Sequence, residues 1–296
     1  MADGNLININ LNLEGLTDFG RAFVEKMHHF GVMLYEPTHM NRKAKAERNA
    51  ALLQAATEVE VTDIQRRAAR RWLEEEGRHQ LNMESIAVKA VPVISESSKP
   101  HEVDDDWIGN FFTKTRIVSD NQMQDLWARI LAGECNSPGA FSKRTVAILS
   151  EIDKADADLF ARLCDFNWII DGDYTPLIFD YDEDVYNSHG VDLDGLHHLS
   201  SIGLINFDPI TRFGLGSFPE QYEVAYHDQR FWLEAPKLNV GHALLTRVGH
   251  QLATICSASP ITGFVEYVGT EWVNHFLDEK AVRDGQQTTG RLEEHG

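Results

Sequence analysis

The first 34 residues hold the clearest alternation of apolar and polar positions in the chain. From residue 7 to residue 13, aliphatic side chains alternate with asparagines, which is the period-two pattern of a β-strand with one apolar face. The next 130 or so residues have helical and turn patterns, so no strand partner lies close in sequence. The hydrogen-bonding partner is therefore expected in the distant C-terminal sheet of the same chain or in another copy.

After residue 15 the apolar period changes to three or four residues, which predicts an amphipathic helix up to residue 34. Burial in the protein core is the ordinary fate of such a stripe, and a second subunit or a lipid surface are the alternatives. Charged residues interrupt the stripe too often for a helix that spans a bilayer. We expect residues 1–34 to form an oligomerisation or membrane interface. Its apolar positions are Ile7, Ile9, Leu11, Leu13, Leu16, Phe19, Phe23, Met27, Phe30 and Leu34.

A helical hairpin is predicted over residues 35–94. Pro37 suits the first turn of its first helix, and the second helix is expected over residues 63–91. In the second helix four arginines precede three glutamates by about one turn, which predicts a solvated face of self-paired charges. The alternative is an anion-binding or lipid-headgroup site on the arginines. These candidate residues are Arg66, Arg67, Arg70 and Arg71.

Residues 102–170 carry the strongest motif and are predicted as a helical domain. Acidic residues from Asp104 open one helix, and Ser119 with Gln122 suggests the capping box of another. A turn at residues 136–139 then precedes a helix that begins near residue 141. The positions that define the motif are Trp107, Trp127, Pro138, Gly139 and Arg144.

This motif resembles a known family. The run VSDNQMQDLWARILAGE at residues 118–134, followed by SPGAFSKRT at 137–145, is similar to the bacterial domain-of-unknown-function family 2806. The resemblance also takes in residues 34–37, 42–47 and 82–86, and so covers most of residues 30–170. The family has no assigned chemistry. Helical proteins with amphipathic N-termini occur among bacterial abortive-infection and phage-defence components, so the resemblance favours a defence role by analogy.

The C-terminal half predicts a mixed domain at residues 171–277. A helix over residues 192–205, strands at 222–226 and 230–234, and a strand that leads into a helix at 242–253 resemble a winged helix. A final strand is expected at residues 263–268, and residues 278–296 are expected to be a disordered tail. The predicted fold class is α+β, with a mostly helical N-terminal half that opens with a β-strand and a winged-helix-like C-terminal domain.

Charge divides the chain into two unlike halves. Residues 1–150 contain 18 Lys and Arg against 21 Asp and Glu, a net charge of −3, whereas residues 151–296 contain 9 against 25, a net charge of −16. Because affinity for nucleic acids comes mainly from neutralised phosphates, the second half should bind them poorly. The three cysteines, Cys135, Cys164 and Cys256, form no CxxC pair and fit a reduced, cytoplasmic protein.

Candidate catalytic and metal-binding patterns are weak. Asp180, Asp182 and Asp184 alternate like the start of a calcium loop, but Val185 and Val191 occupy positions that need glycine and glutamate. The sequence therefore excludes an EF-hand and leaves a weak cation-site candidate at the three aspartates. The sequence contains no phosphate-binding glycine loop with its lysine and no nucleophile elbow, so no cofactor is expected.

These patterns predict a non-enzymatic, self-associating bacterial protein with a role in anti-phage or abortive-infection defence. Its expected partners are copies of itself and a second protein that contacts the acidic domain. Its expected location is the cytoplasm, with peripheral contact to the inner membrane as an option. Two alternatives stay open: a winged-helix regulator that binds nucleic acid, and a metal-dependent hydrolase or nuclease.

Overall fold

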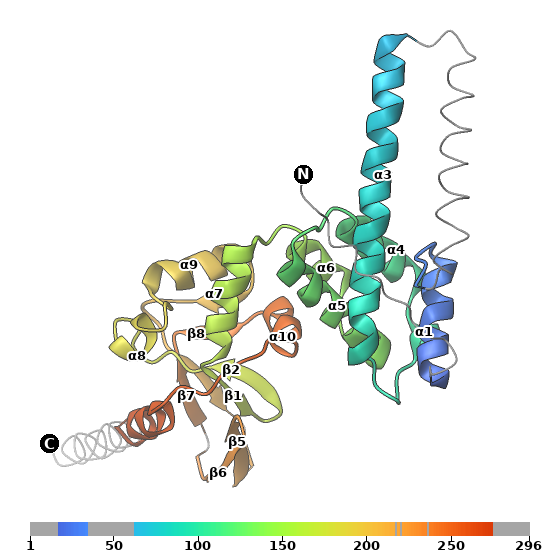
Figure 1. Cartoon of the computed structure of the whole chain (residues 1–296). Coiled ribbons are helices and arrows are strands. Elements are labelled where there is room, and N and C mark those ends of the chain that lie inside the picture. The colour runs from blue at the N-terminus through green and yellow to red at the C-terminus, as the bar shows by residue number, and fades with distance from the viewer. Residues whose placement is uncertain (1–16, 35–61, 217, 220, 236, 275–296) are drawn as a thin grey trace, which may run out of the picture. The chain divides into compact units, whose positions relative to one another are not determined.

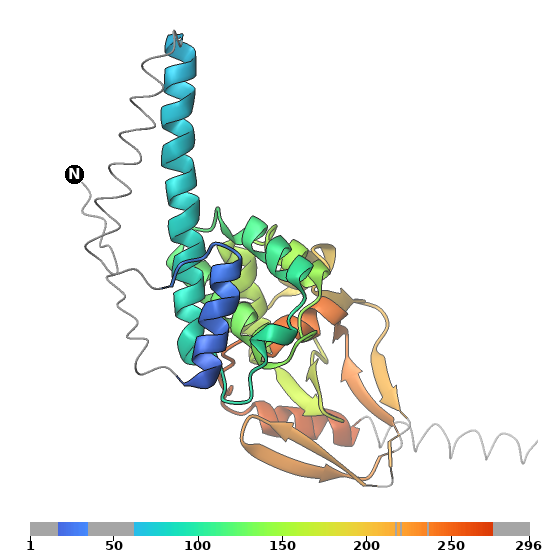
Figure 2. The same ribbon diagram turned by 90° about the vertical axis from the view of Figure 1, so that its right-hand side faces the viewer.

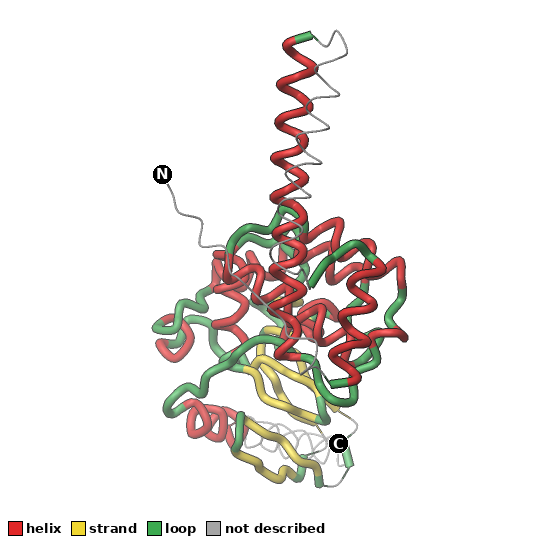
Figure 3. The backbone as a smooth tube through the Cα atoms, turned by 45° about the vertical axis from the view of Figure 1, so that its right-hand side comes forward, coloured by secondary structure: helices red, strands yellow, loops and turns green. Residues whose placement is uncertain are grey.

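The computed structural model describes residues 17–34, 62–216, 218–219, 221–235 and 237–274. The chain divides into two compact units, Met1–Ser150 and Glu151–Gly296, called unit 1 and unit 2 below (Figure 1). In the described residues, helices dominate unit 1, whereas unit 2 combines helices with three small sheets (Figure 3). The α+β class predicted from the sequence is confirmed. The expected N-terminal strand and the first helix of the hairpin lie outside the described residues.

Unit 1 is a helical assembly around aromatic side chains. Trp107 stacks on Phe111 at a ring distance of 5.2 Å, and Trp127 meets Phe111 edge-on at 5.4 Å. All three are almost fully buried, so this cluster is the centre of the unit. The described helices are α1 (Asp18–His29), α3 (Asp63–Ala90), η2 (Val91–Val93), η3 (Pro100–Glu102), α4 (Asp105–Thr115), α5 (Asn121–Asn136) and α6 (Lys143–Leu149).

Local sequence explains where these helices begin. Thr62 and Gln65 form a reciprocal capping box at the start of α3, which satisfies backbone donors that the first turn leaves unpaired. Asp104 caps α4 as expected. Helix α5 is capped by Asp120, whose side chain accepts a hydrogen bond from the backbone N–H of Met123. The capping box predicted for Ser119 is therefore wrong by one residue, a normal error because either side chain can cap a helix.

Helix α3 has two dissimilar halves. Its second half, residues 77–90, packs beside α5, where Ser85 donates to Gln124 at 2.8 Å and Lys89 pairs with Asp125 at 2.8 Å. Its first half, residues 63–76, extends beyond the other described helices of unit 1 (Figures 1 and 2). Nearly every residue of this first half is exposed. We call residues 63–76 the arm and residues 77–90 the base of α3.

Unit 2 is built on three antiparallel sheets. The largest has the strand order β2-β1-β5-β6, and two further pairs join β3 to β8 and β4 to β7. The strands are β1 (Asn167–Ile170), β2 (Asp173–Pro176), β3 (Ile205–Phe207), β4 (Phe213–Gly216), β5 (Tyr222–Tyr226), β6 (Gln229–Leu233), β7 (Lys237–Gly241) and β8 (Ala243–Leu245). The named helices are α7 (Lys154–Cys164), α8 (Asp184–Asn187), α9 (Leu193–Ser201) and α10 (Arg247–Ala253), and residues 264–274 are also helical.

The strand expected at residues 263–268 is wrong, because these residues begin the last described helix. Its buried side chains are Phe264, Val268 and Trp272, spaced four residues apart. Trp272 meets Trp168 of β1 edge-on at 5.2 Å, and its indole N–H donates to the carbonyl oxygen of Asn239 at 3.0 Å. The helical spacing was visible in the sequence, but the short aromatic and β-branched segment also fits a strand.

The hairpin of β5 and β6, with its turn at His227 and Asp228, is confirmed, as is the strand that leads into a helix at β8 and α10. The hairpin pairs with β1 in the largest sheet. The winged-helix likeness of this half stays a prediction.

The division after Ser150 also differs from the boundary expected after residue 170. Helix α7 belongs to unit 2, where its Asp156 lies 2.6 Å from His198 of α9.

Candidate functional site

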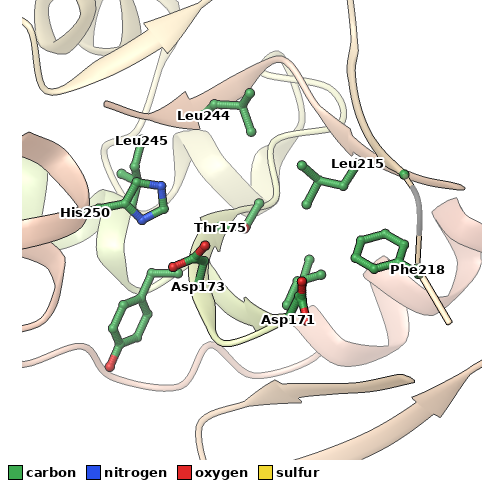
Figure 4. A pocket seen from close by; sticks show the side chains of 11 residues that line it. Asp171, Asp173, Thr175, Leu215, Phe218, Leu244, Leu245 and His250 are labelled. Carbon is green, nitrogen blue, oxygen red and sulfur yellow. The ribbon is translucent and has the colours of Figure 1, made fainter. Parts of the chain in front are cut away.

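A pocket of about 280 Å³ in unit 2 is the candidate ligand site. Strands β4 and β8, helix α10 and the turn between β1 and β2 supply its walls. In the view of Figure 4, Asp173 lies between His250 and Asp171, and Leu215 and Phe218 lie at the right of the pocket. The lining residues are Ile170, Asp171, Asp173, Tyr174, Thr175, Leu215, Gly216, Phe218, Leu244, Leu245 and His250.

The tight β1–β2 turn places the two carboxylates. Ile170 pairs with Asp173, so Asp171 and Gly172 form a two-residue loop, and both have positive φ, 53° and 86°. Asp-Gly is a preferred sequence for such loops because aspartate tolerates this conformation and glycine adopts it freely. The turn leaves both aspartates exposed at the mouth of the pocket. Aspartate in this pair therefore has a conformational role in addition to its charge.

The lining chemistry suits a cationic group on an apolar stem. Two carboxylates face a wall of leucines and the ring of Phe218, and the unit around them is strongly acidic. A lysine or arginine side chain combines these two requirements, since its stem is apolar and its head is charged. A carboxylate and an imidazole could also act as acid and base, but no hydrogen bond joins Asp173 to His250 in the described part of the chain.

The three aspartates considered for a cation do not form a metal site. The side chain of Asp180 accepts from the backbone N–H of Asp182 at 3.1 Å, which makes a local turn, and Asp184 begins the short helix α8. Among the residues that the structure describes, no group of three His, Cys, Asp or Glu side chains is arranged to hold a metal ion. The carboxylates are therefore part of an acidic loop.

The motif residues of unit 1 hold a loop in place. Trp107 donates its indole N–H to the carbonyl oxygen of Phe141 at 2.7 Å. The buried carboxylate of Glu134 accepts from the backbone N–H groups of Gly139 at 2.7 Å and Phe141 at 2.8 Å. Gly139 has a φ of +91°, which side-chain-bearing residues rarely adopt. The Pro138–Gly139 turn is thus a structural element, and Arg144 lies exposed on α6.

Glu134 was absent from the sequence-based candidates, although its identity in the motif was visible. Burial raises the pKa of its carboxyl group, while the two backbone hydrogen bonds oppose the shift. A buried acid in a helix gives no signal of its role until the loop that it holds is known.

A family model described as protein of unknown function (DUF2806) matches residues 66–269. The chain belongs to the DUF2806 family. The resemblance seen in the sequence is thereby confirmed, but the match begins in the arm of α3 and extends through most of unit 2, well past residue 170. No curated protein and no solved structure matches the chain.

In this DUF2806 chain, the described part of the expected N-terminal interface is mostly buried within the chain itself. Phe23 and Met27 of α1 have no exposed surface, and Leu34 is also buried, whereas Phe19 and Phe30 are partly covered. Lys26 fixes the helix by donating to the carbonyl oxygen of Val103 at 3.0 Å. An interface through Phe23, Met27 and Leu34 is therefore wrong for the folded chain, because the core already covers them. Ile7, Ile9, Leu11, Leu13 and Leu16 lie outside the described residues.

The four arginines considered for anion binding lie on the exposed arm of α3. Arg66 pairs with Asp63 at 3.1 Å, Arg70 with Glu74 at 3.2 Å, and Arg71 with Glu75 at 3.7 Å. Arg67 donates to the carbonyl oxygen of Asp63 at 3.4 Å. Neighbouring acids therefore offset much of their charge. Anion binding at this site stays a prediction, and no described helix has the length and apolar character needed to cross a membrane.

The fold brings together two cysteines that are distant in sequence. Cys164 ends α7, Cys256 follows α10, and their side chains are hydrogen-bonded. This hydrogen bond and burial raise the pKa of the Cys164 thiol well above its usual value. In unit 1, burial raises the pKa of Cys135 to about 12. Both buried thiols are consequently protonated and poorly nucleophilic at neutral pH.

Proposed function

We propose that this protein is a non-enzymatic, self-associating protein whose copies pair through the arm of α3. The observation that carries this proposal is the exposure of the arm together with its pattern of side chains. Ile64 is 70 % exposed and Trp72 is 59 % exposed. Exposed aromatic and aliphatic residues on a projecting helix are typical of a surface that a partner covers.

The apolar positions of the arm continue the buried face of the base. Ile64, Ala68 and Trp72 are spaced four residues apart, and the same side of the helix continues into Ile86 and Ala90, which are fully buried. Glu75, His79 and Asn82 interrupt this side of the helix, so its apolar positions form two groups, of which unit 1 covers only the group in the base. A second helix packed on the arm would cover the remainder.

Charge order along the arm favours a second copy in antiparallel orientation. The segment with Arg70 and Arg71 precedes the segment with Glu74 and Glu75, so two arms that cross near Leu73 place the basic part of each beside the acidic part of the other. A parallel pair would place like charges together. The antiparallel pair also keeps the two Trp72 side chains near its centre, where covered aromatic residues contribute most to affinity.

A pair of charge variants of the full chain tests this arrangement. The acidic-arm variant carries Arg70→Glu and Arg71→Glu, and the basic-arm variant carries Glu74→Arg and Glu75→Arg. Each variant alone should have a lower mass than the wild type in light scattering, because like charges face each other where two of its arms would pair. An equimolar mixture should form heterodimers, which weaken as salt is added.

Arg144→Glu, an exposed charge reversal on α6, is the matched control and should leave the mass unchanged. A wild-type chain that is monomeric at all concentrations, or a mixture that forms no heterodimer, would refute pairing through the arm. The first outcome would assign the apolar side of the arm to another part of the same chain.

The cellular role proposed for this assembly is a component of anti-phage or abortive-infection defence in the bacterial cytoplasm, with peripheral contact to the inner membrane. The family resemblance supports this role by analogy, and the net charge of −16 in residues 151–296 favours a protein over a nucleic acid as the partner of unit 2. Phage plaque counts on cells with and without the gene test the role. Equal plaque numbers on cells with the wild-type gene, cells with the arm variants and cells without the gene would refute it.

A further inference from the structure

Strand β6 forms an open edge of the largest sheet in unit 2. It is the last strand in the order β2-β1-β5-β6, and Tyr226 and Gln229 close its two-residue hairpin with β5. In such a hairpin the closing pair exchanges hydrogen bonds, and bonded and non-bonded pairs then alternate along the strands. Gln229, Phe231 and Leu233 therefore direct their backbone groups to β5. Arg230 and Trp232 direct their N–H and C=O groups away from the sheet.

The two faces of this edge differ in polarity. On the inner face, Phe231 contacts Trp168 at a ring distance of 5.5 Å, yet Phe231 and Leu233 are only partly covered. On the outer face, Arg230 is exposed and Trp232 is 67 % exposed. A strand added to β6 would complete the inner face if it had apolar side chains on that side and polar side chains on the other.

The opposite edge of the sheet is not equivalent. Strand β2 lies beside β8, and α10 packs against both strands. For the residues that the structure describes, β6 is thus the edge with room for another strand, and an exposed tryptophan on such an edge gives little protection against strand addition.

We propose that residues 7–13 of a second copy add to β6 as a fifth strand of this sheet. This inference deepens the self-association proposed above. Residues 7–13 lie outside the described structure, and the argument from them rests on their sequence. Their seven residues are enough to span the five of β6. Their strict alternation places Ile7, Ile9, Leu11 and Leu13 on the inner face and the three asparagines beside Trp232 on the outer face.

Charge also fits this occupant. Residues 5–13 contain no charged side chain, so they meet no repulsion from a unit whose sequence carries a net charge of −16. Period-two alternation also restricts the register, because a shift by one residue would expose every aliphatic side chain and bury every asparagine. Strand addition of this kind gains affinity from backbone hydrogen bonds and specificity from alternate side chains.

Disulfide trapping between two differently tagged full-length chains tests the proposal. One chain carries Asn8→Cys, Asn10→Cys or Asn12→Cys in turn, the other carries Arg230→Cys, and both carry Cys256→Ser. Outer-face residues on neighbouring strands lie close enough for a disulfide. At least one position should give a covalent product with both tags, at ten-fold or higher yield than Ile9→Cys, which is expected on the opposite face.

A chain that carries both cysteines is tested in parallel. If the disulfide forms only within this single chain, and not between two chains, the proposal is overturned, because the strand then comes from the same copy. An equal yield with Ile9→Cys, or no product at any position, would also overturn it.

A backbone test uses Trp232→Pro, which removes an outward N–H of β6 without removing a hydrogen bond to β5. Trapping should fall at least five-fold in this variant and stay within two-fold of wild type in Trp232→Thr. The backbone N–H of Arg230 also points away from the sheet. Arg230→Pro combined with Trp232→Cys is therefore the second variant if Trp232→Pro does not fold.

The arm and the strand are independent surfaces, so the two proposals fail separately. Trapping that fails while the charge variants still form heterodimers would remove only strand addition. Trapping that succeeds while the arm variants show no pairing would remove the arm interface and leave self-association through β6.

Discussion

Helix α1 buries its apolar side within unit 1, whereas the arm of α3 leaves Ile64 and Trp72 exposed to solvent. Both helices are amphipathic, and both lie in the same unit. In α1, Phe23 and Met27 pack into the core and Lys26 binds Val103 and Asp105. In the arm, three arginines pair with acids of the same helix. An amphipathic pattern thus specifies which side of a helix needs cover, but not what covers it.

The largest expected difference between the two helices comes from removing an aromatic side chain from each. Phe23→Ala should lower the free energy of unfolding by about 3–5 kcal/mol, since it leaves a cavity in the core. Trp72→Ala should change it by no more than about 0.5 kcal/mol in the monomer, because the side chain is exposed. Urea unfolding at a concentration low enough to keep the chain monomeric measures both. Equal losses in the two variants would show that Trp72 is covered within the monomer.

A second comparison removes one cation from each helix. Lys26→Ala should cost about 1–3 kcal/mol, because it leaves the carbonyl oxygen of the buried Val103 without its donor. Arg70→Ala should cost about 0.3–0.5 kcal/mol, the usual value for an exposed pair one turn apart. The same unfolding measurement applies. A loss of 1 kcal/mol or more at Arg70, comparable with that at Lys26, would contradict the view of the arm as a solvated helix.

Removal of the α3 cap should have a smaller and more local effect. Thr62→Ala breaks the capping box and should cost about 1 kcal/mol of helix stability. Because the base is held by α5, hydrogen exchange should rise in the first turns of the arm and stay unchanged over residues 77–90. Faster exchange along the whole helix would mean that the arm and base unfold together. Thr62→Ser, which keeps a hydroxyl group, is the matched control.

The smallest expected effect is a pH dependence at Glu134. Its pKa is raised in the folded state, so the folded chain binds this proton more tightly than the unfolded chain. Its contribution to stability is therefore present in full below the unfolded pKa, about 4.3, and is lost as pH rises through the raised value. Relative to Glu134→Gln, which cannot ionise, the wild type should lose stability over this range. An advantage of the wild type that grows with pH would show that the two backbone hydrogen bonds outweigh burial.

Several elements were predictable because their signals are local. The helix over residues 63–91 was predicted almost to its ends, since capping residues and periodicity fix it without reference to the rest of the chain. The β5–β6 hairpin and the β8–α10 transition were predicted for the same reason. The acidic character of residues 151–296 also follows from composition alone.

Other features depend on which segments meet, and no local pattern contains that information. The carboxylate of Glu134 became a structural group only when the turn at Gly139 and Phe141 folded against it. The sheet order decided that Arg230 and Trp232 face an open edge, and the fold brought Asp171, Asp173 and His250 to one pocket. Burial and hydrogen bonding between distant residues set their exposure and pKa, so the sequence determined the elements and their charge, and the tertiary structure decided which of their faces remain available for partners.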